Sequence, residues 1–220
     1  MSKNIIIFFG PPGSGKGTQA EMLAKITDFK KISTGDLFRS EIAAKTKIGK
    51  MVEKYIIIGK LVPDKITVKL VEGSLKQKTS GFIFDGFPRN KKQLIELHGL
   101  LKKTLKKNDQ VYAIEVAVSD KEVKQRLGQR RMCTCGRVYH LVYNPPINTG
   151  VCDICGGKLF VRNDDKSKVI SHRLKIYHHE GEPILDYWQK QGKLIKIDGE
   201  QPIKKIHGEI MQNLKELKLI

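Results

Sequence analysis

Long apolar stretches are missing from this 220-residue sequence, in which no segment approaches the ~20 consecutive apolar residues of a membrane span. The first residues, Met1-Ser2-Lys3-Asn4, lead into a short apolar segment and lack the h-region and cleavage site of a secretory signal. Internal repeats and low-complexity tracts are absent as well. We therefore expect a cytoplasmic protein without membrane association, built as one domain with insertions or as two small domains.

Acidic residues are scarce relative to basic ones: 23 Asp and Glu stand against 41 Lys and Arg, which gives a formal net charge of +18. This balance favours polyanionic partners such as nucleotides, nucleic acids or anionic lipids. The lysines are dispersed, as in Lys102-Lys103 and Lys106-Lys107, and no basic block is interleaved with the aromatic residues of a nucleic-acid groove. We interpret most of them as solvated surface and expect no nucleic-acid partner.

The most informative motif that is present follows the apolar residues 5–9 and reads Gly10-Pro11-Pro12-Gly13-Ser14-Gly15-Lys16-Gly17-Thr18. This order predicts a buried strand, a glycine-rich turn and a helix start. The spacing is that of a P-loop with Gly17 inserted before the hydroxyl residue. Glycines leave backbone N–H groups free to face phosphate oxygens, the helix adds its positive dipole end, and Lys16 adds a mobile charge.

Apolar strand-like runs alternate with helix-like segments along most of the chain. Strands are predicted at residues 5–9, 31–33, 81–85, 111–118 and 194–198, and helices at 16–27, 64–77, 91–105, 120–132 and 166–191. Pro63 suits a first helical turn, and Ser119 before Asp120 and Glu122 suits an N-cap. The alternation implies an α/β fold with a doubly wound parallel sheet covered on both faces.

Two stretches interrupt the alternation. Residues 34–62 read as short helices without a strand between them, and residues 133–165 contain the four cysteines, two adjacent prolines and little helical period. We expect both to be insertions at the carboxyl edge of the sheet, where ligands bind in such folds.

The strand predicted at residues 81–85 ends on an acid, Asp85, and continues into Gly86-Phe87-Pro88-Arg89. An Asp at a strand end is by itself more often a helix cap. Beside a P-loop, the better interpretation is that it organises the water molecules of Mg²⁺ bound to nucleotide phosphates.

Together with Ile32-Ser33-Thr34-Gly35-Asp36-Leu37-Phe38-Arg39, this segment resembles the adenylate kinases of the bacterial long-lid type, and the resemblance covers nearly the whole chain. It implies a P-loop kinase core at residues 1–32, 63–128 and 166–220. It also implies a helical insertion for the acceptor nucleotide at 33–62 and a small zinc-ribbon-like lid at 129–165. The implied reaction is Mg²⁺-dependent phosphoryl transfer from ATP to AMP, giving two ADP, by a monomer.

The resemblance also assigns site residues. Those for ATP are Gly13, Ser14, Gly15, Lys16, Gly17, Thr18, Arg126, Arg130, Val138, Tyr139 and Gln201, with Arg126 stacking on adenine and residues 197–201 meeting it through their backbone. Those for AMP are Thr34, Arg39, Lys60, Leu61, Val62, Gly86, Phe87, Pro88, Arg89, Gln93, Arg162 and Arg173. The catalytic set is Lys16, Asp85, Arg89, Arg130, Arg162 and Arg173.

Elementary chemistry supports these roles for the arginines. Phosphoryl transfer leaves a protein little covalent work, so catalysis comes from alignment and from cations spread over the transferring group. The planar guanidinium grips phosphate oxygens in two places. Because this chain otherwise uses lysine heavily, arginines at turns and segment ends are informative; a single one could equally form a surface salt bridge.

The four cysteines form two close pairs, Cys133-Thr134-Cys135 and Cys152-Asp153-Ile154-Cys155. Two such pairs in a cytosolic chain indicate a zinc ribbon. The first pair departs from the usual Cys-x-x-Cys spacing, so the backbone geometry around its sulfurs is in question. Our leading interpretation is zinc held by all four cysteines; the alternatives are Asp153 or His140 replacing one of them, or four free thiols. A disulfide does not suit a reducing cytosol.

Two other functions compete with this interpretation. A pyrimidine nucleoside monophosphate kinase is favoured by Asn90 after Arg89, but Thr34, Gln93 and the long lid favour the adenylate type. A nucleic-acid-binding zinc-ribbon protein would use the charge and the cysteines but would leave the P-loop without a role.

Overall fold

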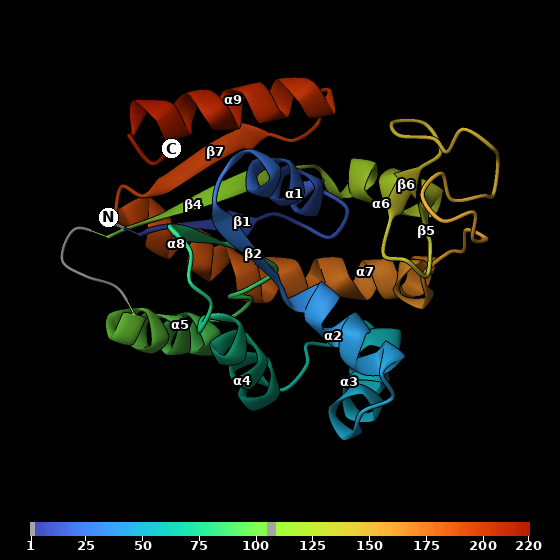
Figure 1. Cartoon of the computed structure of the whole chain (residues 1–220), viewed down its shortest axis with the longest axis horizontal. Coiled ribbons are helices and arrows are strands. Elements are labelled where there is room, and N and C mark those ends of the chain that lie inside the picture. The colour runs from blue at the N-terminus through green and yellow to red at the C-terminus, as the bar shows by residue number, and fades with distance from the viewer. Residues whose placement is uncertain (1–2, 105–108) are drawn as a thin grey trace.

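A parallel five-stranded sheet forms the centre of the computed structural model, which describes residues 3–104 and 109–220 (Figure 1). The strands are β1 (Asn4–Phe9), β2 (Phe29–Ser33), β3 (Gly81–Asp85), β4 (Gln110–Ala117) and β7 (Leu194–Asp198). Their order is β2-β3-β1-β4-β7, and each neighbouring pair is parallel. The predicted strands are confirmed to within two residues. Lys106, Lys107 and the end predicted for a helix at residue 105 lie outside the described residues.

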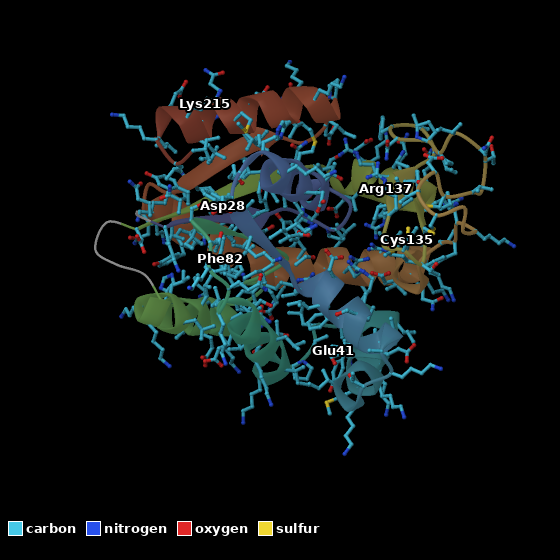
Figure 2. The ribbon with its side chains drawn as sticks, in the orientation of Figure 1. Asp28, Glu41, Phe82, Cys135, Arg137 and Lys215 are labelled. Carbon is cyan, nitrogen blue, oxygen red and sulfur yellow. The ribbon has the colours of Figure 1, made fainter. Side chains whose placement is uncertain are left out.

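Both faces of the sheet are buried, because β1 is apolar at successive positions and its side chains alternate between the faces. Ile6 and Phe8 pack with α1 (Lys16–Ile26) and α9 (Ile203–Glu216). Ile5, Ile7 and Phe9 pack with α4 (Asp64–Ser74), α5 (Lys91–Thr104) and α8 (Glu182–Lys190), and Phe82 lies on this second side (Figure 2). The doubly wound arrangement that the alternation predicted is confirmed.

Residues 34–62 contain two helices, α2 (Thr34–Ala43) and α3 (Lys47–Ile57), as the sequence predicted. Phe38, Val52 and Val62 give them a small apolar cluster apart from the sheet. The two helices approach closely at Gly49, where an added Cβ would lie 2.1 Å from the backbone oxygen of Glu41. Glycine therefore sets the distance between α2 and α3.

Residues after α6 (Asp120–Gln129) form an extended region with a small antiparallel hairpin, β5 (Arg130–Met132) and β6 (Val138–His140), and a 3₁₀ turn, η1 (Asn163–Asp165). Ser119 caps α6 by accepting a hydrogen bond from the Glu122 amide, as predicted. In Figure 2, Glu41 on α2 and Cys135 beside β5 mark two parts that extend beyond the sheet. The two stretches that interrupt the alternation of strands and helices, residues 34–62 and 133–165, therefore lie outside the central sheet.

Three of the predicted helices have other boundaries in the structure. The helix predicted at 120–132 ends at Gln129, because Met132 exchanges backbone hydrogen bonds with Phe160 and residues 130–132 pair with β6. The helix predicted at 166–191 is divided into α7 (Ser167–Ile176), a π-helical turn, η2 (Tyr177–Gly181), and α8. Pro183 has no N–H to continue the α-helical ladder, and a widened turn before it accommodates the missing bond. The helix predicted at 64–77 ends at Ser74.

Parallel strands place their carboxyl ends at one edge of the sheet. The last residues of β1, β2, β3 and β4 therefore lie along the same edge; they are Phe9, Ser33, Asp85 and Ala117. The register is specific: Asp85 lies beside Phe8 on one side and beside Ser33 on the other. Within residues 3–104 and 109–220, no helix is long and apolar enough to cross a bilayer.

The close approach at Gly49 predicts that Gly49→Ala lowers the free energy of unfolding by about 1–3 kcal/mol, because the methyl group overlaps the α2 backbone. Gly208→Ala on α9 is the matched control, since nothing lies within 4 Å of its added Cβ. This control should raise the free energy of unfolding by about 0.5–1 kcal/mol. Urea unfolding followed by circular dichroism measures both, and equal stabilities would contradict the packing described.

Candidate active site

The glycine-rich loop between β1 and α1 leaves the first turn of α1 open to an anion. The N-cap residue of α1, Gly15, has a φ of 91° and supplies no side-chain cap for the free amides of this helix end. Gly13 has a φ of 81°, and a Cβ there would lie 2.8 Å from Cγ of Leu127. The loop therefore needs glycine at both positions, and its amides suit a phosphate group.

Lys16 begins α1, and its ammonium lies among other cations. Its Nζ donates to the backbone oxygen of Pro11 at 3.0 Å. The pKa of Lys16 is lowered to about 8, mainly by desolvation. The charge of Asp85 opposes this shift, and the positive charges of Arg89, Arg173 and Arg130 add to it. Lys16 is therefore charged at neutral pH in a site that favours a negatively charged ligand.

Three arginines that the sequence singled out come together around Lys16, although they belong to different elements, and a fourth, Arg162, lies next to one of them, Arg130. Arg89 follows β3, and its Nε donates to the Gly86 carbonyl at 2.7 Å. Arg130 in β5 holds Asp165 through two hydrogen bonds, at 2.8 and 2.5 Å. Arg173 in α7 pairs with Asp164 at 2.8 Å and reaches Asp165 at 3.5 Å.

In the part of the chain that the structure describes, Arg162 is held by a sulfur atom and not by a carboxylate. Its Nε donates to Sδ of Met132 at 2.9 Å, and within residues 3–104 and 109–220 its guanidinium takes part in no ion pair. Desolvation and the charges of Arg130 and Arg39 lower the pKa of Arg162 to about 9, and similar causes lower that of Arg173 to about 10. Since arginine stays protonated at neutral pH, these charges need an anionic partner.

Asp85 is placed to act on the loop that it faces. Its Oδ2 accepts a hydrogen bond from Ser33 Oγ at 3.2 Å, and a Cβ built on Gly17 would lie 3.1 Å from the same oxygen. The carboxylate thus lies against the first turn of α1. An oxygen ligand at this place suits a hard cation such as Mg²⁺ between the loop and a phosphate.

The residues expected to hold the acceptor nucleotide lie on the other side of Asp85. Thr34 Oγ1 donates to the Gly86 carbonyl at 2.8 Å, and Phe87 is fully buried. Arg39 in α2 pairs with Asp36. Lys60, Leu61 and Val62 follow α3, and Val62 joins the apolar cluster between α2 and α3.

Gln93 is fixed by protein partners. Its Oε1 accepts from the Arg89 amide at 2.8 Å, and its Nε2 donates to Asp64 at 2.8 Å. Asn90 donates to the same oxygen of Asp64 at 3.0 Å. Each end of the Gln93 amide can still make one further hydrogen bond, so a base edge with one donor and one acceptor would suit it. Nothing in the sequence assigned Asp64 to the site, because this residue belongs to no recognisable motif.

On the donor side, Arg126 connects three elements. It donates to Glu122 at 2.7 Å and to the Ser14 carbonyl at 3.4 Å, and its guanidinium lies 5.5 Å from the centre of the Tyr143 ring. Tyr143 also donates to Glu122 at 3.2 Å. The spacing of Glu122 and Arg126 on one helix face could have shown their pairing, whereas nothing in the sequence pointed to Tyr143.

The other residues expected on the donor side lie in β6 and beyond the end of β7. Val138 and Tyr139 form most of β6, and the Gln201 side chain, beyond β7, has a buried oxygen without a partner in the described structure. Ser14 Oγ, buried in the phosphate loop, likewise has no partner there. These two buried polar atoms mark the loop and the β7 end as places where a further hydrogen bond can form.

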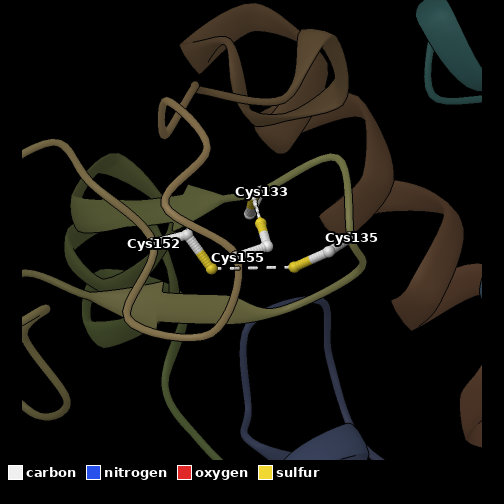
Figure 3. Close-up of side chains that lie close together, drawn as sticks. All are labelled: Cys133, Cys135, Cys152 and Cys155. Atoms are coloured by element: carbon white, nitrogen blue, oxygen red, sulfur yellow. Dashed lines mark hydrogen bonds between the residues drawn. The ribbon is translucent and has the colours of Figure 1, made fainter.

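The four cysteines converge from two turns of the region that contains β5 and β6 (Figure 3). Their sulfurs all lie within 4.8 Å of one another, with Cys133 and Cys155 3.4 Å apart and Cys135 and Cys152 3.6 Å apart. Tetrahedral zinc with Zn–S bonds of about 2.3 Å requires similar separations. The donor set and its geometry fit zinc.

Backbone amides support the sulfurs in both turns, including the short one. Hydrogen bonding from the Cys135 amide lowers the pKa of Cys133, so the short Cys-x-Cys turn also directs a backbone amide at a sulfur. The Tyr139 hydroxyl lowers the pKa of Cys152 to about 6, although burial opposes it. The backbone of Gly157 favours the Cys155 thiolate, but the other thiols and burial raise the pKa of Cys155 to about 12.

Comparison with known proteins supplies a family. A family model described as "Adenylate kinase" matches residues 8–193. The chain is 42% identical over 214 residues to an adenylate kinase of Streptomyces avermitilis, with 96% of each chain covered. It is 43% identical over 211 residues to one of Methanothrix thermoacetophila, covering 95% of this chain and 97% of the relative. For one of Archaeoglobus fulgidus the identity is 42% over 216 residues, with 97% and 99% covered.

The lowered pKa of Lys16 predicts that binding of ATP takes up protons at pH 8–9. Near pH 8 about half of the Lys16 side chains are neutral, and a bound phosphate restores the charge. Affinity for ATP should therefore fall as the pH rises through 8. Titration calorimetry in buffers of different ionisation enthalpy measures the uptake. Lys16→Arg, which stays charged, should lose it; unchanged uptake in this variant would assign the proton to another group.

Proposed function

The chain belongs to the adenylate kinase family, and we propose that its own substrates are ATP and AMP, which it converts reversibly into two ADP. Membership makes the chain a phosphotransferase acting on nucleotides. The observation that supports the proposal is the gathering of Lys16, Arg89, Arg130, Arg162 and Arg173 at the carboxyl edge of the sheet.

This gathering carries more positive charge than the nearby carboxylates can neutralise. The five cations influence one another's pKa values, and three carboxylates act on them in the opposite direction: Asp85, Asp164 and Asp165. A polyphosphate supplies the missing negative charge. As the transferring phosphoryl group passes from donor to acceptor, charge spreads over its oxygens, and fixed cations stabilise that distribution without reorganising.

The donor nucleotide is assigned to the phosphate loop. Amides of residues 13–18 and the Lys16 ammonium would hold its phosphates, and Arg126 would stack on its adenine beside Val138, Tyr139 and Gln201. Mg²⁺, when bound with ATP, would neutralise part of the phosphate charge. Asp85 faces the loop closely enough to hold the water molecules of that ion.

The acceptor nucleotide is assigned to the side of α2 and α3. Arg39 and Arg89 would hold its phosphate, with Arg162 and Arg173 shared between the two nucleotides. Thr34, Gln93 and residues 60–62 would surround its base, beside residues 86–88. Gln93 retains one donor and one acceptor valence, which complements the amino group and ring nitrogen of adenine.

We assign the core to residues 1–32, 63–128 and 166–220, the acceptor-binding insertion to 33–62 and the lid to 129–165. A lid that closes over the donor would exclude water and so prevent hydrolysis in place of transfer. The hairpin that supplies Arg130 belongs to this lid, so closing the lid would also position a catalytic cation.

The lid is the proposed site of one structural zinc ion bound by Cys133, Cys135, Cys152 and Cys155. The four free thiols within 4.8 Å of one another support this assignment. Asp153 is engaged elsewhere, because its carboxylate accepts from the Ile147 amide, and His140 Nδ1 accepts from the amides of residues 142 and 143. Reduced thiols are maintained in the cytoplasm, where we propose that the enzyme works as a monomer.

The two competing functions are not favoured. The relatives that cover nearly the whole chain are adenylate kinases. Asn90 is the residue that suggested a pyrimidine acceptor. Its side chain donates a hydrogen bond to Asp64 and accepts one from the backbone N–H of Gln93. A nucleic-acid-binding zinc ribbon would not require a P-loop beside the arginine cluster.

The acceptor assignment predicts that AMP is phosphorylated faster than CMP, UMP or GMP. A site that hydrogen-bonds one base edge leaves buried groups unpaired with another base, and this penalty is large. Coupled ADP formation with each acceptor measures the preference. Lys16→Met should lose activity with every acceptor by about 100- to 1,000-fold while remaining folded. Equal turnover with CMP or UMP would overturn the acceptor assignment without affecting the role of Lys16.

The zinc assignment predicts about one zinc ion per chain and a lower thermal stability after chelation, because structural zinc contributes folding free energy. The sheet should stay folded, since its apolar clusters share no residue with the cysteines. Metal analysis and thermal unfolding before and after chelation measure both effects. Cys135→Ser should bind zinc more weakly. Stoichiometric, equally tight zinc in this variant would indicate another fourth ligand, and no zinc in the wild type would indicate free thiols.

A further inference from the structure

Tyr139 is buried in the lid with only 2% of its surface exposed, in one cluster with Cys133, Cys152 and Leu159. Its backbone belongs to β6 and pairs with Arg131 of β5, the residue after Arg130. The Arg137 guanidinium lies 5.9 Å from the centre of its ring. The aromatic ring thus fills the space between the hairpin and the cysteine turns, and its hydroxyl group reaches the second turn.

The hydroxyl group makes two contacts, and their chemistry gives them a direction. The Asp153 amide donates to the Tyr139 oxygen at 2.8 Å. Cys152 Sγ lies 3.4 Å from the same oxygen. Because an amide can only donate, the phenolic oxygen is the acceptor in the first contact, and its proton is available for the sulfur in the second. Asp153 is the residue after Cys152, so both contacts hold the same turn.

We propose that Tyr139 is an outer-shell residue of the metal site, which orients Cys152 and favours its thiolate by donating a hydrogen bond to its sulfur. The inference rests on the proposed zinc site and goes beyond it, since the ligand set alone gives no role to Tyr139. Metal ligands in proteins depend on such outer-shell partners for orientation and affinity.

The position of Tyr139 gives this contact a second consequence. Val138 and Tyr139 are the β6 residues assigned to the donor nucleotide, and β6 pairs directly with the strand that carries Arg130. The Tyr139 side chain therefore joins the cysteine turn to the hairpin through one rigid ring. Zinc would hold the hairpin in register through this ring as well as through the turns themselves.

Zinc affinity of wild type, Tyr139→Phe and Tyr143→Phe, measured by competition with a chromophoric chelator, tests the proposal. Tyr139→Phe keeps the ring and removes only the hydroxyl group, and it should weaken zinc binding by about 10- to 100-fold. Tyr143→Phe removes a hydroxyl group from the same lid that bonds to Glu122 and not to a cysteine, and its zinc affinity should equal that of the wild type. Equal affinities in all three proteins would overturn the inference.

Cobalt substitution gives a readout that a merely structural role of Tyr139 would not change. The charge-transfer bands of thiolate-bound Co²⁺ start from sulfur lone pairs, which a hydrogen bond stabilises. Tyr139→Phe should therefore shift these bands to longer wavelength, and Tyr143→Phe should leave them in place. Bands at the wild-type wavelength in Tyr139→Phe would show that its hydroxyl group does not act on the sulfur.

Two further outcomes are separable. If Tyr139→Phe binds no metal, thermal unfolding of the metal-free proteins decides the cause: equal midpoints for variant and wild type support the outer-shell role, and a lower midpoint for the variant assigns the loss to folding and overturns it. If the wild type binds no zinc, the zinc assignment itself fails. Zinc in the wild type with unaltered affinity in Tyr139→Phe leaves that assignment intact and removes only the role of Tyr139.

Discussion

Repulsion among the cations at the carboxyl edge of the sheet is the constraint to which the rest of the structure responds. Five cations from different segments of the chain meet here: Lys16, Arg89, Arg130, Arg162 and Arg173. The positive charge of each one lowers the pKa of another, or its own pKa is lowered in this way. A fold can tolerate such crowding only where other groups hold each cation in place. Here the holding groups are backbone carbonyls and a few carboxylates, which fix the arginines while leaving donors free for phosphate.

Asp165 carries the largest share of this task. Its side chain is fully buried and accepts two hydrogen bonds from Arg130 in β5 and a longer one from Arg173 in α7. One carboxylate therefore connects β5, the 3₁₀ turn η1 and α7. A buried charge pair contributes little net stability, because desolvation offsets the attraction, but loss of one partner leaves an uncompensated charge. The value of Asp165 lies in fixing the positions of two cations relative to each other.

The sequence was sufficient for the strands, the phosphate loop and the identity of the cationic residues, because each has a local signal. Apolar runs of five to eight residues show four of the strands, glycine spacing shows the loop, and arginine stands out where lysine is the common basic residue. The partners of those residues have no such signal. Asp64, Asp165 and Tyr143 act through contacts between distant segments, and only the fold brings them to the site.

The boundary errors have the same origin. Residues 130–132 continue a helical pattern, but pairing with β6 and Phe160 makes them a strand. The π-helical turn at Tyr177–Gly181 accommodates the missing N–H of Pro183 at the start of α8, and the hydrophobic periodicity of the sequence does not show such a turn. In both places a tertiary or backbone constraint overrides local preference, and the first of them determines where Arg130 lies. A helical Arg130 would have no paired strand to direct it.

The proposed lid, residues 129–165, has a very small buried cluster, and two of its four members are cysteines. Its buried cluster consists of Cys133, Tyr139, Cys152 and Leu159, while Ile147 and Ile154 are 86% and 70% exposed. So small a cluster cannot offset the conformational entropy of a long loop region, whereas a bound metal ion can. If zinc orders this region as we propose, the region needs no apolar core in common with the sheet, and, within the described residues, its buried cluster shares no residue with the clusters of the sheet. In the proposed mechanism the region would then close as a unit over the donor site and keep Arg130 in its own hairpin, and this closure would exclude water from phosphoryl transfer.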